Sequence, residues 1–317
     1  MANETGTLQP DATSKPQRTL AAASLDRNEL KRSRSFYQRA WSTFRRDKVA
    51  MTALAISVLL IVFSFGAPIV AHLTGHSYAR NNLRLQLLAP FENSSYILGT
   101  DANGRDILTR LAYGGRVSML VAGLSLIFTL IIGSTVGAIA GFFGGFIDNL
   151  LMRFVDVVIS IPGITLLLLL SVLWRPGPVG LAVVIAAISW TGVSRLIRGE
   201  VLTLKHRDYI DAARVIGATD RRIIISHIFP NVLSIVIVWA SLALPSLIIT
   251  EATLSYLGFG VRIPIPSWGN MLNEANQFYT QSWTFAFLPG FMIFLAALCF
   301  NLVGNGLRDA LDPRLNN

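Results

Sequence analysis

The stretch that decides the fold is VLSIVIVWASLALPSLIITEATL, residues 232–254, which contains a single charged side chain, Glu251. A helix rises about 1.5 Å per residue, so a run of this length crosses a hydrocarbon layer of about 30 Å. Further apolar runs of comparable length lie near residues 49–73, 117–143, 150–174, 179–197 and 285–304. The sequence therefore predicts an all-α, polytopic membrane protein with six transmembrane helices.

The composition supports a membrane protein rather than a soluble one. Of the 317 residues, 52% are hydrophobic and 14% are charged, against about 25% charged in typical soluble domains. A net charge of +9 would indicate nucleic-acid binding in a soluble chain, but here the basic residues cluster beside the apolar runs, next to the lipid bilayer. No nucleic-acid partner is predicted. The single cysteine, Cys299, excludes an intrachain disulfide and a cysteine-based metal site within the chain.

The lysine and arginine residues predict the orientation in the membrane. With a cytoplasmic N-terminus, 20 of the 27 basic residues lie on the cytoplasmic side. The opposite side holds the other seven: Arg80, Arg84, Arg105, Arg110, Arg116, Arg175 and Arg262. Because loops rich in lysine and arginine stay in the cytoplasm, the N- and C-termini are both predicted to be cytoplasmic.

The N-terminal region is predicted to have two parts. Residues 1–24 are small and polar, which is typical of a disordered cytoplasmic tail. Residues 25–48 are rich in basic side chains and predict an amphipathic interfacial helix, with aromatic residues at helical spacing: Tyr37, Trp41 and Phe44. An ordinary solvated helix is the alternative. The transmembrane domain then occupies residues 49–317 and includes a cytoplasmic loop at 200–231.

That loop contains a polar stretch, DAARVIGATDRRIIISHIFPN, residues 211–231, whose pattern predicts two short helices joined at a glycine. Asp208 is placed to cap the first helix, and Gly217 to end it in a left-handed conformation. Thr219 is placed to cap the second helix, and Pro230 marks the entry into the span at 232–254. One face of the first helix is predicted to carry Tyr209, Ala212, Ala213 and Ile216.

Ala212 and Ala213 are the most informative pair in this loop. Side chains this small allow a helix to insert closely into the groove of a partner, and arginines are available for the rim: Arg207, Arg214, Arg221 and Arg222. The pattern alone fits equally well with a surface helix pair that packs only on its own bundle or on lipid headgroups.

Glycine and proline mark special positions in the spans. A glycine at every fourth position predicts a tight helix–helix seam, inside or between subunits, rather than contact with lipid: Gly133, Gly137, Gly141 and Gly145. Prolines inside predicted spans each remove a backbone hydrogen bond and favour a bend; they include Pro162, Pro245 and Pro289.

The chain lacks the motifs of several enzyme classes, including the P-loop, HExxH and GxSxG. Asp156 and Glu251 are the main charged residues in the predicted spans, and their scarcity counts against an autonomous ion-driven carrier. His72 and His76 are spaced i, i+4 but have no adjacent carboxylate, so no metal site is predicted. A self-sufficient channel or carrier and an intramembrane enzyme are the alternatives.

Several motifs resemble those of binding-protein-dependent ABC importer permeases. Residues 211–217, DAARVIG, followed by HIFP at 227–230, look like the EAA motif of that family. Four stretches are similar to the C-type permease subunit of its dipeptide, oligopeptide and nickel branch: GTDANGRD at 99–106, EATLSYLGFG at 251–260, PSWG at 266–269 and GLRDALDP at 306–313. The resemblance runs from about residue 35 to the end. The departures are Asp211 for glutamate, His227 for an aliphatic residue, and Asn305 for an acid.

The resemblance implies a type I importer permease that has no catalytic residue and binds no cofactor or metal itself. It implies a second homologous permease subunit, two cytoplasmic ATP-binding subunits that use ATP and magnesium, and an extracytoplasmic substrate-binding protein. The location implied is a bacterial or archaeal cytoplasmic membrane. The ATPase-coupling segment would contain Asp211, Ala212, Ala213, Gly217, His227 and Pro230.

The resemblance also implies a cargo, namely dipeptides or oligopeptides, with nickel chelates or other small solutes as the alternative. The segments 99–106 and 266–269 are expected to form part of the face on which the binding protein docks. Glu251 is expected either to contact a peptide ammonium along the substrate path or to pair with an arginine near the outer interface.

Overall fold

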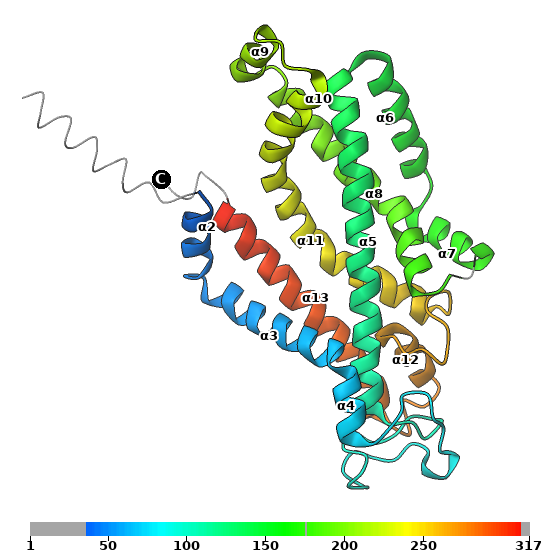
Figure 1. The fold of residues 1–317 in the computed structure, drawn as a ribbon. Coiled ribbons are helices and arrows are strands. Elements are labelled where there is room, and N and C mark those ends of the chain that lie inside the picture. Colours follow the sequence, from blue (N-terminus) through cyan, green and yellow to red (C-terminus); the bar gives the residue numbers. More distant parts are fainter. Residues whose placement is uncertain (1–35, 175, 312–317) are drawn as a thin grey trace, which may run out of the picture.

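A computed structural model describes residues 36–174 and 176–311. Within these residues the chain consists of helices joined by loops, without a β-strand (Figure 1). The all-α prediction is therefore confirmed. The predicted tail at 1–24 and the first part of the predicted interfacial helix, residues 25–35, lie outside the described residues.

In the described part of the chain, five helices are long and apolar enough to cross a membrane. They are α3 (Lys48–Phe65), α5 (Ile107–Phe143), α8 (Pro178–Leu204), α11 (Phe229–Tyr256) and α13 (Trp283–Leu311). A sixth crossing exists if α6 (Gly145–Ser160) and α7 (Gly163–Trp174), which meet at 85°, form one broken span. The predicted span at 150–174 is thus divided at Pro162, where a bend was predicted, whereas each of the other five runs contains a long helix.

The sharp bend between α6 and α7 occurs at a proline. Ile161 is extended, with φ −91° and ψ 131°, because a proline disfavours helical geometry in the residue before it. That proline, Pro162, stands next to Gly163, a residue that also weakens a helix. Pro245 and Pro289 instead lie inside the continuous helices α11 and α13. A neighbouring glycine does not by itself explain the break, because Pro289 is followed by Gly290 and α13 continues through both residues.

Several predicted span boundaries need correction. The run at 49–73 breaks at Gly66 into α3 and a short helix, α4 (Ala67–Thr74). Helix α8 continues to Leu204, beyond the predicted run at 179–197, and carries both Arg195 and Arg198. Helix α5 begins at Ile107, inside the predicted outer loop, because Asp106 caps it by accepting a hydrogen bond from the Thr109 N–H.

Helices α5 and α8 form the most extensive helix pair, and three glycines allow their close approach. A Cβ atom on Gly133 would lie 2.1 Å from Val193 Cγ1, and one on Gly137 would lie 2.4 Å from the Ser194 carbonyl oxygen. Gly141 meets Arg198 and Val201 of α8 in the same way. The fourth glycine of the row, Gly145, has open space around it and begins α6, so it does not belong to this contact.

Helix α13 packs against both α3 and α11 (Figure 1). Near its C-terminal end, Gly306 lies against Ala50 of α3 and Phe44 of α2 (Phe36–Phe44). Ala40 and Phe44 are buried in this contact, whereas Trp41 is exposed. The described part of the predicted interfacial helix thus packs on the bundle through one apolar face.

The remaining segments gather at two opposite ends of the molecule (Figure 1). What we call the α9 end carries α9 (Asp208–Val215), α10 (Asp220–Ile223) and the π-helical turn η2 (Ile224–Ile228). The α4 end carries α4, the loop at 75–106 with its short helix η1 (Leu83–Leu85), and α12 (Trp268–Ala275).

Candidate docking surface

A tightly closed helix terminus forms the tip of the α9 end. Gly217 has φ +83°, a left-handed conformation that costs glycine little, and this agrees with the sequence-based prediction. Its N–H donates to the Arg214 carbonyl at 2.9 Å, and the Ala218 N–H donates to the Ala213 carbonyl at 3.0 Å. These two bonds form a Schellman motif, which satisfies carbonyls that the end of a helix leaves unpaired. The chain reverses there and enters α10.

The inward face of α9 is anchored in an apolar core. Ile210 is completely buried, and Ala213, one turn further on, is buried as well. The core around Ile210 draws on α5, α8 and the segment leading into α11, and contains Phe142, Val193, Ile197, Val201, Leu204, Ile223, Ile228 and Val232. Sequence reasoning did not identify Ile210, although its i, i+3 spacing to Ala213 was a signal that marks a helix face. The helix is therefore fixed on the bundle.

The two alanines lie on different sides of α9, which corrects one sequence-based expectation. Ala212 is exposed, whereas Ala213 faces the chain's own core. Tyr209 and Ile216, which were predicted to share one face with both alanines, are exposed. Neighbouring residues on an α-helix are about 100° apart, so Ala212 and Ala213 cannot both point at one partner.

The outward face of α9 ends in two large apolar side chains. Val215 and Ile216 are 86% and 85% exposed and stand directly before Gly217. Beside them, Arg214 Nη1 donates to Asp211 Oδ1 at 3.3 Å, and the Arg214 guanidinium lies 5.9 Å from the centre of the Phe142 ring. An exposed apolar pair with charged neighbours on a rigidly mounted helix is typical of a protein-binding surface.

The second short helix continues into the long span without a turn. Thr219 caps α10 by accepting a hydrogen bond from the Arg222 N–H at 3.4 Å, as predicted. Pro230 was predicted to mark the entry into the span at 232–254, but the residues from Asp220 to Tyr256 form one continuous helical stretch, so no separate helix begins at the proline. A π-helical turn precedes the proline: the Phe229 N–H bonds to the Ile224 carbonyl five residues back. This wider turn accommodates a proline ring that would crowd an α-helical carbonyl.

His227 lies within that π-helical turn and faces α9. Its ring is 6.4 Å from the ring of Tyr209, at an angle of 48°, and its carbonyl accepts a hydrogen bond from Asn231 Nδ2 at 2.6 Å. The structure thus brings His227 next to α9, while Pro230 lies one turn further along the continuous helix. The ring contact therefore connects α9 to the helical stretch that continues into α11.

Two ion pairs join α6 to α8. Arg198 donates to both carboxylate oxygens of Asp148, at 2.5 and 2.7 Å. Arg195 Nη2 lies 2.6 Å from Asp156 Oδ1, and both of these side chains are about half exposed, at 49% and 53%. Sequence reasoning found Asp156 as a charge within a span but not its partner. Pairs so far apart in sequence leave no local signal.

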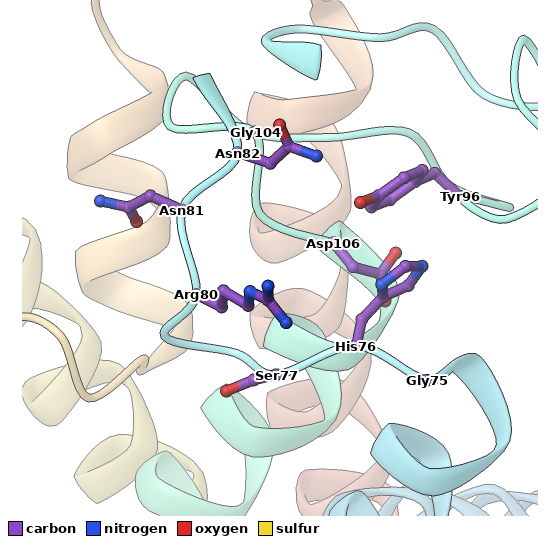
Figure 2. A pocket seen from close by; sticks show the side chains of 9 residues that line it. All are labelled: Gly75, His76, Ser77, Arg80, Asn81, Asn82, Tyr96, Gly104 and Asp106. Atoms are coloured by element: carbon purple, nitrogen blue, oxygen red, sulfur yellow. The ribbon is translucent and has the colours of Figure 1, made fainter. Parts of the chain in front are cut away.

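At the opposite, α4 end, a cavity of about 480 Å³ opens in the loop that follows α4 (Figure 2). Its lining is mostly polar and includes His76, Arg80, Asn82, Tyr96 and Asp106. His72, the other member of the predicted i, i+4 histidine pair, does not line this cavity.

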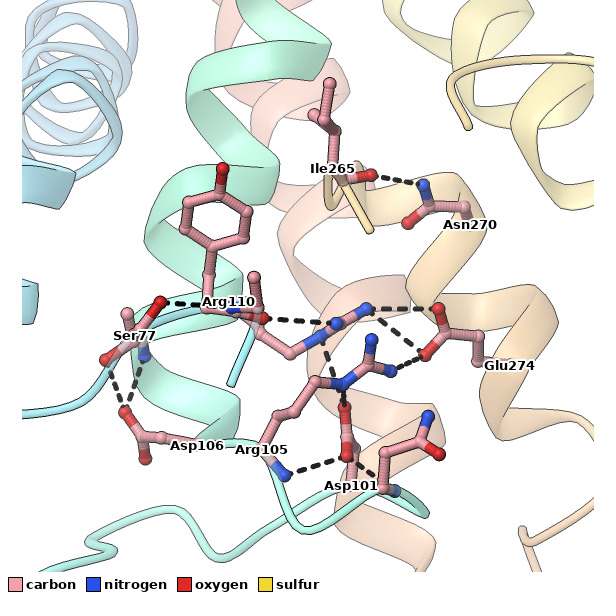
Figure 3. A network of polar contacts seen from close by, with 12 residues as sticks. Ser77, Asp101, Arg105, Asp106, Arg110, Ile265, Asn270 and Glu274 are labelled. Atoms are coloured by element: carbon pink, nitrogen blue, oxygen red, sulfur yellow. Dashed lines mark hydrogen bonds and ion pairs between the residues drawn. The ribbon is translucent and has the colours of Figure 1, made fainter. Parts of the chain in front are cut away.

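Behind that cavity, a buried ion cluster holds the loop to α5 and α12 (Figure 3). Asp101 Oδ2 accepts from Arg105 Nε at 2.6 Å and lies 3.3 Å from Arg110 Nε. Arg110 Nη2 lies 3.1 Å from both oxygens of Glu274, and Arg105 also pairs with Glu274. Four charges therefore compensate one another within one network.

This burial corrects the expectation that the segments 99–106 and 266–269 offer a docking face. Asp101, Arg105 and Asp106 of the first segment are buried. All four residues of the second segment are buried too. Trp268 is completely buried, and its Nε1 donates to the Leu111 carbonyl at 3.0 Å. These motifs build the α4 end instead of facing outward.

Glu251 is enclosed in the same region. Its side chain is completely buried, and its Oε1 accepts a hydrogen bond from Ser255 Oγ at 2.7 Å. No arginine pairs with it in the part of the chain that the structure describes. The Oε2 atom has no hydrogen-bond partner among the described residues, and the complete burial of the side chain supports a structural role over direct contact with a ligand.

Comparison with known proteins gives two matching families. The family described as the binding-protein-dependent transport system inner membrane component matches residues 133–317. The N-terminal TM domain of oligopeptide transport permease C matches residues 35–90.

Individual relatives match over most of the chain. The oligopeptide transport system permease protein OppC of Haemophilus influenzae is 40% identical over 282 residues, which are 89% of each chain. The dipeptide transport system permease protein DppC of Bacillus subtilis is 37% identical over 89% of this chain and 87% of the relative. The glutathione transport system permease protein GsiD of Pectobacterium atrosepticum is 37% identical over 90% of this chain and 93% of the relative.

Proposed function

Since this chain belongs to the family of binding-protein-dependent transport system inner membrane components, we propose that it forms half of the translocation pore of an ATP-driven peptide importer. The relatives are named for transport of oligopeptides, dipeptides and glutathione, which supports a peptide cargo over nickel chelates. The chain itself performs no catalysis. It is a multi-pass protein of a bacterial or archaeal cytoplasmic membrane.

The observation that carries the proposal is the exposed tip of α9. Val215 and Ile216 are apolar, almost fully exposed and mounted on a helix whose other face is buried in the bundle. With the termini in the cytoplasm, the α9 end is cytoplasmic, and water surrounds this tip in the isolated chain. A groove on a cytoplasmic ATP-binding subunit would remove the apolar pair from water, which favours association.

The partners follow from this arrangement. A second homologous permease completes the pore, and two ATP-binding subunits, which use ATP and magnesium, take one permease helix each. An extracytoplasmic binding protein delivers the peptide at the α4 end. Closure of the ATP-binding subunits moves α9, and the continuous stretch from Asp220 to Tyr256 transmits that movement across the membrane. Asp211 and Arg214, joined beside the tip, form the polar rim of the contact.

The test is to place charges on the tip. Val215→Asp/Ile216→Asp leaves the core of α9 intact and puts two carboxylates in the contact, so the ATP-binding subunits should no longer co-purify and ATP-dependent peptide uptake should fall at least about tenfold. The control is Leu83→Asp, which also places a carboxylate at an exposed apolar residue, but at the α4 end. Normal co-purification and uptake with the double variant would refute the proposal.

A further inference from the structure

The cavity in the loop after α4 is lined by the carboxylate of Asp106, of which only one oxygen accepts hydrogen bonds. Asp106 is 2% exposed. Its Oδ2 caps α5, accepting from the Thr109 N–H at 2.8 Å and from Thr109 Oγ1 at 2.5 Å. Its Oδ1 has no hydrogen-bond partner among the residues that the structure describes. A buried acceptor left without a donor is unfavourable, so a ligand donor at this position stabilises the site.

An unpaired positive charge lines the same cavity. Arg80 is exposed and extends into the space between Ser77 and Asp106 (Figure 2). Within the described residues it makes no ion pair, although a buried carboxylate lies across the cavity. The side-chain amide of Asn82 comes from the same segment of the loop as Arg80 and also lines the cavity. The cavity therefore presents a cation and an anion that are not joined to each other.

The walls of the cavity are held in place before any ligand arrives. The His76 ring stacks on the Tyr96 ring at 4.2 Å and 11°. His76 Nε2 is 2.9 Å from the Ser95 carbonyl, which only accepts, so Nε2 carries the proton; Nδ1 has no hydrogen-bond partner among the residues that the structure describes. Gly104, with φ +69°, touches the Asn82 backbone so closely that a Cβ would lie 1.8 Å from its carbonyl oxygen.

We propose that this cavity binds a small zwitterion with a primary ammonium and a carboxylate, such as a short peptide. Asp106 Oδ1 is closed to solvent in this structure, so a small movement of the lining exposes it to the ammonium, from which it then accepts; Arg80 and Asn82 donate to the carboxylate. An anion alone would leave Asp106 unpaired, and a cation alone would leave Arg80 unpaired. A volume of about 480 Å³ lies in the range of small-molecule sites, about 300–1,000 Å³. The inference deepens the proposed function by giving the peptide a contact on this chain.

The probe is glycylglycine, and its binding to the full-length chain in lipid nanodiscs is measured by saturation-transfer NMR. Two analogues each remove one charge: N-acetylglycylglycine lacks the ammonium, and glycylglycine amide lacks the carboxylate. Glycylglycine should bind, and each analogue should bind at least about tenfold more weakly, because each loses a charge-assisted hydrogen bond. Equal binding of all three, or no binding of glycylglycine, would overturn the inference.

Variants locate the site. Arg80→Gln removes the positive charge from an exposed position without touching the cap of α5, and should weaken glycylglycine binding at least about tenfold. Arg84→Gln is the matched control, an exposed arginine of the same loop that does not line the cavity. Asp106→Asn keeps an oxygen to cap α5 and should also weaken binding. Unchanged binding by Arg80→Gln would place the ligand elsewhere and overturn the proposal, whatever happens to the stability of Asp106→Asn.

Peptide uptake by cells that produce the whole transport system separates this inference from the proposed function. Uptake with the unaltered chain, combined with no glycylglycine binding in nanodiscs, would overturn the cavity and leave the importer standing. Binding that Arg80→Gln weakens, in a system that takes up no peptide, would support the cavity and refute peptide import.

Discussion

At the scale of single residues, Ala212 and Ala213 test which side of α9 meets a partner. Ala213 faces the chain's own core, so Ala213→Leu should overpack it and lower the free energy of unfolding by about 1–3 kcal/mol. Ala212 is exposed, so Ala212→Leu should leave stability unchanged but weaken retention of the ATP-binding subunits. Thermal unfolding in detergent and co-purification measure the two effects. If Ala213→Leu is as stable as the unaltered chain, the inward placement is wrong.

A second residue-scale prediction compares the two ion pairs between α6 and α8. Asp148→Ala leaves Arg198 without its two-pronged partner and should destabilise the chain by about 1.5–3 kcal/mol. Asp156→Ala breaks a pair in which both side chains are about half exposed, so it should cost less than about 1 kcal/mol. Thermal unfolding of both variants in the same detergent gives the comparison. Equal losses of stability in the two variants would contradict the prediction that the Asp148–Arg198 pair stabilises the chain more than the Asp156–Arg195 pair does.

Single residues also show where prediction from sequence succeeds. Gly217 and Thr219 were identified because each has a local reason for its position, a left-handed backbone and a helix cap. The partners of Asp148 and Arg110 were not, because Arg198 and Glu274 lie far away in the chain and are brought close only by packing. A single sequence has no periodic signal for such a pair.

At the scale of elements, the contact of α5 with α8 depends on glycine. Gly137→Ala would place a methyl group 2.4 Å from the Ser194 carbonyl oxygen, so the helices must move apart. We expect a loss of about 1–3 kcal/mol in stability. Gly123→Ala, on the same helix but with open space around it, is the control and should be neutral or slightly stabilising, since alanine favours a helix more than glycine. Both are measured by thermal unfolding in detergent, and a Gly137→Ala chain of normal stability would refute the tight seam.

Elements also show where prediction from sequence was limited. Apolar length predicted each long helix, because crossing a bilayer demands it. Bends were less predictable. Pro162, Pro245 and Pro289 each predicted a bend, but of these three only Pro162 lies at a break between helices, whereas α11 and α13 continue through Pro245 and Pro289. A lost hydrogen bond favours a bend, but the packing around it decides whether the helix bends sharply.

At the scale of the whole molecule, the two ends differ in construction. The α9 end holds its capped helix against an apolar core and exposes an apolar tip. The α4 end is held by a buried network of charges, with a polar cavity beside it. The resemblance to importer permeases pointed to segments that lie at both ends. It did not predict that the segment at 99–106 is buried, because a sequence motif does not show which way its side chains face.

The central claim is that α9 docks on a separate ATP-hydrolysing subunit, and site-specific cross-linking tests it most directly. Replacing the single, buried cysteine by Cys299→Ser gives a background in which Ile216→Cys places one reactive thiol at the tip. Leu83→Cys, at the α4 end, is the control. We predict that Ile216→Cys cross-links to the ATP-binding subunit in the assembled system and that Leu83→Cys does not. Failure of Ile216→Cys to cross-link to it, in a system that still imports peptide, would contradict the claim.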